Sequence, residues 1–190
     1  MKTKIFLVRH AKSAAKERGI VQGRGVDVPL TDEGVAQAAR LAEALRQEQF
    51  DHIYASNARR AIDTASAVRV FHPDTPYTEL SELIERSKGE AEGMQRDEFR
   101  LKYPDIQAEW DREEDALPPG GERFADVRER VIPAIERHLS EHGPGKVLLY
   151  VLHGNVNRVL LGHMLDVPYR LQQRIGQGNC AINIAEYDHE

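Results

Sequence analysis

The chain has 190 residues, enough for one domain with a buried core, and its 41% apolar and 30% charged residues exclude a disordered polymer. The formal net charge of −5 argues against a general nucleic-acid binder, because no excess of basic residues is available to neutralise a phosphate backbone. One cysteine, Cys180, excludes an intramolecular disulfide, and no apolar run is long enough to span a membrane. We therefore expect a cytoplasmic protein with no membrane or nucleic-acid partner.

The first predicted strand ends in two functional side chains. Four large apolar residues occupy positions 5–8, and Arg9, His10 and Ala11 follow at once. A continuous run that contains β-branched and aromatic residues is typical of a buried strand. Ligands of open α/β sheets bind just beyond the carboxyl ends of the strands, so Arg9 and His10 are candidates for a site. Taken alone, the pair fits the start of a solvated loop better, because loops after strands are polar by default.

A Gly-rich basic loop comes next, at residues 18–25. Its glycines would let backbone N–H groups approach an anion and Arg24 would add charge, although a flexible surface loop has the same composition. Thr31 is then placed to cap a helix whose first turn holds two acids. The apolar spacing that follows predicts that this amphipathic helix runs to about Gln47.

Residues 50–55 predict the second strand, and a helix capped by Ser56 or Asn57 should follow it. Arg59 and Arg60 fall at the start of this helix. Free N–H groups at a helix start and an arginine side chain together favour binding of an anion. Arg59 and Arg60 therefore follow the second strand in the same way as Arg9 and His10 follow the first.

A short third strand is predicted at 77–80, and the chain then changes character. Residues 86 to about 121 are rich in charges of both signs and end in a Pro-Pro-Gly-Gly run. We expect a partly helical excursion over the active-site edge of the sheet, and not a separate domain. Tyr103 and Trp110 would either cover a bound substrate or pack onto the sheet edge.

Apolar residues at helical spacing over 124–139 predict a long helix that ends at residues 143–145. Pro133 should kink or split it, because the proline ring clashes with the preceding turn. His138 and His142 lie four residues apart, a spacing that can bind a metal. We expect instead two exposed histidines that suit the C-terminal end of a helix.

The strongest strand signal is the apolar run 146–152, which stops at His153. A helix over 156–164 and a last strand over 181–187 complete the chain. Strands that alternate with helices predict a three-layer α/β/α sandwich with a mostly parallel central sheet, built as one domain over residues 1–190.

Chemistry-bearing residues thus gather at predicted strand ends. Arg9 and His10 follow the first strand, the 56–60 segment follows the second, His153 follows another, and Glu85 lies beyond the third. Arginine forks match the oxygens of a phosphate, a neutral histidine can attack phosphorus, and a carboxyl group can exchange the proton of the leaving oxygen. This set of residues favours phosphoryl transfer.

In order, these motifs resemble those of the histidine phosphatase superfamily, the phosphoglycerate mutase-like family, over nearly the whole chain. The matching segments are Arg9-His10-Ala11, Gln22-Gly23 with 29–31 and Gly34, 56–65, Glu85 with Gly89, Glu92 and Gly93, 119–122, and His153-Gly154. The family spacing selects Arg60 over Arg59 and Glu85 over Glu82. The chain departs from the family pattern at Ala11, Ser13, Lys16 and Arg123.

The resemblance implies a role for each matched residue. His10 would be phosphorylated, Arg9, Arg60 and a protonated His153 would hold the phosphoryl oxygens, and Glu85 would be the proton donor. Substrate-binding positions would be Ser13, Gln22, Gly23, Gly154 and Asn155. No metal or other cofactor is implied. Ligation of a metal by His10, His153 and Glu85 is the competing interpretation, weakened by two arginines that would repel a cation.

The leading hypothesis is a phosphomonoester hydrolase that acts on a small phosphorylated metabolite through a phosphohistidine, with a homodimer possible. A cofactor-dependent phosphoglycerate mutase is the nearest alternative, since Glu85-Arg86 resembles the mutase pattern, but Lys88 stands where mutases have tyrosine. A non-catalytic phospholigand or phosphohistidine-binding module is the third. Candidates to select a second anionic group on the substrate are Lys12, Arg24, Arg86, Lys88, Arg96, Arg100 and Arg158.

Overall fold

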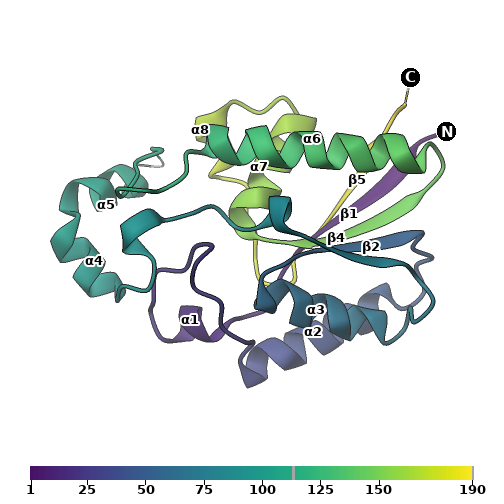
Figure 1. The fold of residues 1–190 in the computed structure, drawn as a ribbon, viewed down its shortest axis with the longest axis horizontal. Helices are drawn as coiled ribbons and strands as arrows, with labels where there is room; N and C mark the ends of the chain where they lie inside the picture. Colours follow the sequence, from purple (N-terminus) through teal and green to yellow (C-terminus); the bar gives the residue numbers. More distant parts are fainter. Residues whose placement is uncertain (113, 190) are drawn as a thin grey trace.

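The computed structural model describes residues 1–112 and 114–189 and is built on one twisted sheet (Figure 1). The described residues form five strands in the order β3-β2-β4-β1-β5. The bounds are β1 Thr3–Arg9, β2 His52–Ser56, β3 Tyr77–Leu80, β4 Val147–Leu152 and β5 Ile182–Tyr187. All neighbouring pairs are parallel except β1 with β5, which confirms the mostly parallel sheet.

Helices cover both faces of the sheet, which confirms the three layers. Figure 1 shows α2 (Asp32–Leu45) and α3 (Arg59–Arg69) on one side, and α6 (Phe124–His142) and α7 (Gly154–Met164) on the other. Side chains alternate along β1, so Phe6 packs with the α2 and α3 residues while Leu7 packs with α6 and α7. Burial on both faces explains why β1 and β4 are continuous apolar runs.

The register of the central strands places their ends together. Arg9 of β1 lies opposite Leu152 of β4, and the amide of His10 donates to the carbonyl of Leu152 at 2.9 Å. β2 pairs with the other side of β4 in the same direction. The segments that follow these three strands therefore meet at one edge of the sheet.

Of the two helix caps predicted from the sequence, the structure confirms the one at α2 and contradicts the one at α3. Thr31 caps α2 as expected, with its Oγ1 accepting from the amide of Gly34 at 3.0 Å. The prediction that Ser56 or Asn57 caps α3 is wrong, because the helix begins at Arg59 and Ala58 occupies the cap position. Ser56 is instead the last residue of β2, and its hydroxyl lies 2.7 Å from Nε2 of His153.

Pro133 does not split the long helix, which runs unbroken from Phe124 to His142. Pro133 and Glu129 both lie on its exposed side. The carbonyl that loses its partner at the proline therefore faces water, which can satisfy it. Buried residues before and after the proline, Val131 and Ile135 among them, hold the helix against the sheet.

The prediction that His138 and His142 are exposed is wrong, because His138 is buried and His142 is partly buried. His138 is 4% exposed, and its ring is stacked at 4.3 Å on Tyr54 of β2. Nε2 of His142 lies 2.8 Å from the hydroxyl of the same Tyr54. The reason is that α6 crosses the sheet with its last turn over β2 and β4. Within the described ranges, no group of three or more His, Cys, Asp or Glu side chains is placed to hold a metal ion.

The charged excursion is partly helical, as expected. It holds the short 3-10 turn Gly89–Ala91 and the helices α4 (Arg96–Lys102) and α5 (Pro104–Asp111), which stand beyond the sheet near α1 (Ala14–Glu17) in Figure 1. Its aromatic residues do not pack onto the sheet edge. They form a separate small apolar cluster around Val21, Ala91 and Phe99.

The remaining short elements are the 3-10 turn Ser81–Leu83, which follows β3, and α8 (Tyr169–Gln172), which packs on α7. Among the helices of the part described, none combines the length and the apolar character needed to cross a membrane.

Candidate active site

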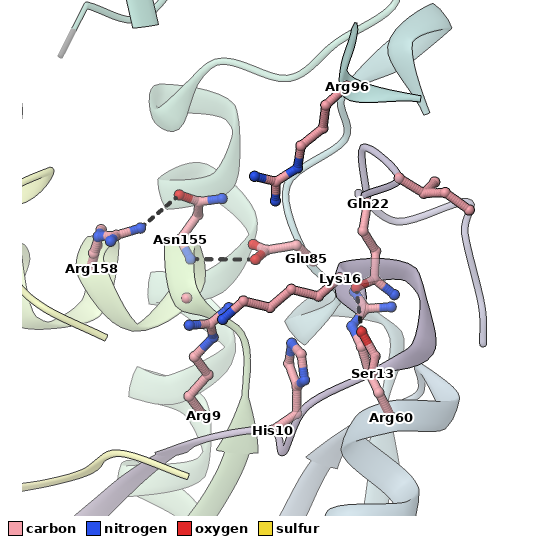
Figure 2. Close-up of a pocket in the computed structure, with 12 residues that line it drawn as sticks. Arg9, His10, Ser13, Lys16, Gln22, Arg60, Glu85, Arg96, Asn155 and Arg158 are labelled. Atoms are coloured by element: carbon pink, nitrogen blue, oxygen red, sulfur yellow. Dashed lines mark hydrogen bonds between the residues drawn. The ribbon is translucent and has the colours of Figure 1, made fainter. Parts of the chain in front are cut away.

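A cavity of about 230 Å³ lies beyond the carboxyl ends of β1, β2 and β4 (Figure 2). It is strongly polar, and cationic side chains dominate its wall. The lining residues are Arg9, His10, Ser13, Lys16, Ile20, Gln22, Arg60, Glu85, Arg96, Gly154, Asn155 and Arg158. Four of the five residues expected to handle a phosphoryl group are in this wall, and the fifth, His153, lies directly behind it.

His10 is held with one ring nitrogen engaged and the other available. Its Nδ1 lies 2.7 Å from the carbonyl oxygen of Ala11. A carbonyl can only accept, so we assign the proton of the neutral ring to Nδ1, which leaves the lone pair on Nε2. Burial, and then the charges of Arg60 and Arg9, hold the pKa of His10 well below its usual range. The ring is therefore a neutral, oriented nucleophile.

Arg9 and Arg60 are anchored by backbone carbonyls instead of acids. Nη1 of Arg9 donates to the carbonyl of Gln177. The guanidinium of Arg60 donates to the carbonyls of Gly23 at 3.0 Å and Val26 at 3.3 Å. Nε of each arginine is buried without a hydrogen-bond partner among the described residues. Both guanidinium groups thus keep their charge and a free donor for an anion.

His153 is fully buried, with its ring centre 5.2 Å from that of His10. Its Nε2 lies 2.7 Å from Oγ of Ser56, while its Nδ1 has no partner in the residues described. Burial, and then Arg60 and His10, lower the pKa of His153 well below its usual range. The ring is therefore neutral until an anion arrives, and the protonated form expected from sequence requires a bound dianion beside it.

Glu85 reaches the same cavity from the segment after β3. Its Oε1 accepts from the amide of Arg86 at 2.8 Å, and its Oε2 accepts from the amide of Asn155 at 3.4 Å. Figure 2 shows this carboxylate facing the space above Arg9 and His10. Glu82, the other glutamate considered, pairs with Arg137 at the surface. The geometry therefore selects Glu85.

The predicted substrate-binding positions divide into two groups. Ser13, Gln22, Gly154 and Asn155 line the cavity, and Oγ of Ser13 donates to Gln22 at 2.7 Å. Gly23 does not line it. A Cβ there would lie 2.1 Å from Oε1 of Glu92, so glycine is needed for the loop to pass this carboxylate, and the carbonyl of Gly23 supports Arg60. Its role is to position the arginine.

Two polar residues of the site were missed by sequence reasoning. Gln177 holds Arg9 through its backbone, and Nδ2 of Asn179 donates to the carbonyl of His10 at 3.0 Å. Oδ1 of Asn179 also accepts from Nζ of Lys16, a residue of the cavity wall, at 3.1 Å. Both lie in the Gly-rich turn before β5, which carries no spacing signal beyond its two glycines.

Comparisons with known proteins agree with this geometry. The sequence model described as "Histidine phosphatase superfamily (branch 1)" matches residues 5–190. The 2,3-bisphosphoglycerate-dependent phosphoglycerate mutase of Cytophaga hutchinsonii is 33% identical over 163 residues, which cover 84% of this chain and 76% of the relative. The enzyme of the same name from Rhizobium etli is 33% identical over 166 residues, with 82% and 77% covered.

Solved structures give the same architecture. Bacillus stearothermophilus YhfR superposes with a TM-score of 0.91 at 30% identity, over 98% of this chain and 92% of that one. The alpha-ribazole phosphatase of Shigella flexneri gives a TM-score of 0.84 at 26% identity, over 95% and 89%. The names of these similar proteins divide between mutases and phosphatases, so they leave the specific reaction open.

Proposed function

This chain belongs to the histidine phosphatase superfamily, and from that premise we propose that it is a phosphomonoester hydrolase acting on a small phosphorylated metabolite. The observation that carries the proposal is the convergence of a neutral His10 with Arg9, Arg60 and Glu85 on one cavity, with the ring centre of His153 5.2 Å from that of His10. These groups suit a phosphoryl group attacked by His10. Two guanidinium charges supply the electrophilic assistance that a metal provides elsewhere, which supports a metal-independent reaction.

In the first step of the proposed reaction, Nε2 of His10 attacks phosphorus and the bond from phosphorus to the ester oxygen breaks. The protonated carboxyl group of Glu85 gives its proton to that oxygen, and the alcohol leaves. Arg9, Arg60 and His153 hold the three phosphoryl oxygens as their charge is redistributed.

The second step reverses the use of Glu85. Its carboxylate takes a proton from a water molecule, and the resulting oxygen attacks the phosphorus of phosphohistidine. The N–P bond breaks, its electron pair returns to Nε2 of His10, and inorganic phosphate leaves. Glu85 is protonated again and His10 is neutral, so the cycle closes without a further reactant.

Phosphate release from a panel of phosphomonoesters tests the proposal, measured with a metal chelator present. We expect wild-type protein to turn over at least one ester and His10→Ala to lose on the order of a thousandfold or more of that rate. His163→Ala, which removes an exposed histidine of α7 outside the cavity, is the matched control and should retain activity. An acid-labile phosphoenzyme should be trapped in the wild type only. An unchanged rate in His10→Ala, or activity abolished by chelator, contradicts the mechanism.

A phosphoglycerate mutase is the second candidate, and the names of the curated relatives favour it. Arg86 of the Glu85-Arg86 pair is 2% exposed, pairs with Asp115 and lies outside the catalytic cavity wall. It is therefore placed to support the fold of the excursion and not to bind the substrate. A coupled assay that follows interconversion of 2- and 3-phosphoglycerate in the presence of 2,3-bisphosphoglycerate separates the two reactions. If interconversion is faster than phosphate release, the mutase becomes the leading candidate and the hydrolase the second.

A binding module without turnover is the third candidate. Trapping of a phosphohistidine that forms on His10 but never releases phosphate would support it. The presence of Glu85 across from His10, with both carboxylate oxygens fixed by amides, favours turnover instead.

A further inference from the structure

A second cavity, of about 420 Å³, adjoins the catalytic one. The two share Gln22 and Arg96 as wall residues. The second cavity lies between the 18–25 loop and the helices α4 and α5 of the excursion, with Lys88 and Trp110 in its wall. Figure 2 shows Arg96 reaching from the start of α4 toward Glu85 and Asn155. A molecule whose phosphoryl group lies at His10 can therefore extend past Arg96 into the second cavity.

Seven cations were candidates to bind a second anionic group of the substrate. The ion pairs of the structure show which of them an acid already neutralises. An acid neutralises each of four: Lys12 with Glu33, Arg24 with Glu122, Arg86 with Asp115, and Arg100 with Asp97. A fifth, Arg158, donates to the carbonyl of Ile175 and to Asn155. Arg96 and Lys88 form no ion pair with any acid in the described part of the chain. These two cations line the second cavity, whose wall also holds the acid Asp111, but neither is in ion-pair contact with it.

Lys88 is a half-buried cation held in place by its neighbours. Its amide donates to Glu92 at 2.7 Å, and its Nζ lies 4.4 Å from the centre of the Trp110 ring. The indole is itself fixed, since it stacks on Phe99 at 4.6 Å and donates to the carbonyl of Ala116 at 2.8 Å. Burial lowers the pKa of Lys88 to about 8. A partly desolvated cation that is fixed over a ring face, with no ion-pair partner among the residues described, favours an anion that joins it.

We propose that the second cavity receives the leaving group of the substrate, and that Arg96 and Lys88 bind a second anionic group, a carboxylate or a phosphate, on that leaving group. This inference rests on the proposed hydrolase function and narrows its substrate class. Arg96 lies where the two cavities join and meets the nearer part of the leaving group. Lys88, whose Nζ lies over the Trp110 ring, lines only the second of the two cavities and is therefore farther from His10.

Three esters with the same three-carbon backbone test the inference: propyl phosphate, 3-phosphopropionate and 1,3-propanediol bisphosphate. They end in a methyl, a carboxylate and a second phosphate. We expect kcat/KM for one of the two anionic-ended esters to exceed that for propyl phosphate by at least about tenfold, mainly through KM. The better of the two identifies the anion.

Variants assign the preference to its residues. Arg96→Gln and Lys88→Gln should each reduce the ratio of the anionic to the neutral ester toward one, and the ratio cancels any common effect on phosphoryl transfer. Lys102→Gln is the matched control, because Lys102 lies on α4 over Tyr103 and outside the second cavity wall. It should keep the ratio. Equal kcat/KM for all three esters, or a ratio unchanged in both cavity variants, overturns the inference while leaving the hydrolase function intact.

Binding separates this inference from the proposed function. If no ester is hydrolysed, the hydrolase proposal fails, and calorimetry of the same three esters with His10→Ala still measures the second cavity. Tighter binding of an anionic-ended ester, lost in His10→Ala combined with Lys88→Gln, supports the anion site. Equal affinities for all three esters refute it.

Discussion

Nε of Arg9, Nε of Arg60 and Nδ1 of His153 are buried nitrogens that lack a hydrogen-bond partner among the described residues. Leaving a buried donor unsatisfied costs about 1–3 kcal/mol of stability each. Arg9 and Arg60 line the cavity beside His10, and the ring centre of His153 lies 5.2 Å from that of His10. An anion bound beside His10 would offset the unpaired charge of these residues, so residues that weaken the free fold would strengthen binding of the anion.

Arg60→Gln tests this arrangement through pH. Removal of the guanidinium should lower kcat/KM by about 10²- to 10³-fold, the usual loss for one fixed donor to a transition-state oxygen. After burial, Arg60 is the leading cause that lowers the pKa of His10. Its loss raises that pKa, so His10 becomes protonated and inactive at a higher pH. The acidic limb of kcat/KM against pH should therefore move upward.

Arg59→Gln is the matched control, because Arg59 is the exposed neighbour that pairs with Asp63 at 2.7 Å. It should keep both the rate and the position of the acidic limb. An NMR titration of His10 in the two variants measures the pKa directly. An acidic limb that stays in place in Arg60→Gln would show that Arg60 does not set the protonation of His10.

The five residues predicted to handle the phosphoryl group, Arg9, His10, Arg60, Glu85 and His153, share one property: each lies at or after the end of a parallel strand. Gln22 of the 18–25 loop, in contrast, was identified only through the family resemblance. Register alone brings Arg9 and His10 to His153, so strand prediction was sufficient to group them. Gln177 was missed because it acts through its backbone carbonyl, which every residue type possesses. Residue type therefore carried no information about that contact.

Glu92 joins two elements of the site. Its carboxylate accepts from the amides of Arg24 and Lys88, at 3.0 Å and 2.7 Å, and from the amide of Gly25. It therefore ties the 18–25 loop to the segment after Glu85. The same loop supplies a carbonyl anchor of Arg60, so the position of that guanidinium depends on this connection.

Glu92→Ala should lower kcat/KM by about ten- to a hundredfold, because an arginine displaced by about 1 Å loses its alignment with the phosphoryl oxygens. The unfolding free energy should fall by about 1–2 kcal/mol, since a partly buried amide loses its acceptor. Steady-state kinetics and denaturant titration measure the two effects. Glu90→Ala, which removes an exposed carboxylate that contacts only Tyr103 among the described hydrogen-bonding groups, should leave both values near wild type. Equal losses in the two variants would contradict the role given to Glu92.

Helices and strands were predictable where the residue types of a segment favour the same element that its burial in the fold requires. The strand Tyr77–Leu80 was found as predicted, and so was the Thr31 cap of α2. Prediction failed at two positions of α6 where the residue type was given more weight than its place on the helix. Pro133 is tolerated because it faces solvent, and His138 is buried because the last turn of α6 covers the aromatic rings of β2 and β4. Helical spacing does agree with both outcomes, because residue 138 lies seven positions after the buried Val131 and residue 133 only two after it.

At the scale of the whole molecule, buried histidines couple stability to pH. Burial is the leading cause that lowers the pKa values of His10, His52, His138 and His153. The unfolded chain therefore binds more protons than the native protein just below the ordinary histidine pKa of about 6.5. The contribution of these histidines to the free energy of unfolding is fully present above that pH, and it is lost progressively as the pH falls below it.

His138→Phe tests this coupling at a position remote from the catalytic cavity. Phenylalanine keeps a ring stacked on Tyr54 and near Tyr150 but cannot take up a proton. The melting temperature should fall less steeply from about pH 7 to about pH 5 than it does for the wild type. Circular dichroism melts at matched ionic strength measure it, and melts at about pH 8 show whether the variant folds normally. A slope identical to that of the wild type would show that His138 does not contribute to the acid sensitivity.

The separation between the Phe99 cluster and the two core clusters that flank the sheet has a consequence for the history of such a protein. Mutations in α4 and α5 alter the wall of the second cavity while the strand ends that hold His10 stay in register. Substrate range can therefore drift across generations without loss of the chemistry. A laboratory library confined to residues 94–112 should likewise yield folded enzymes with new preferences more often than one of equal size spread over the strand ends.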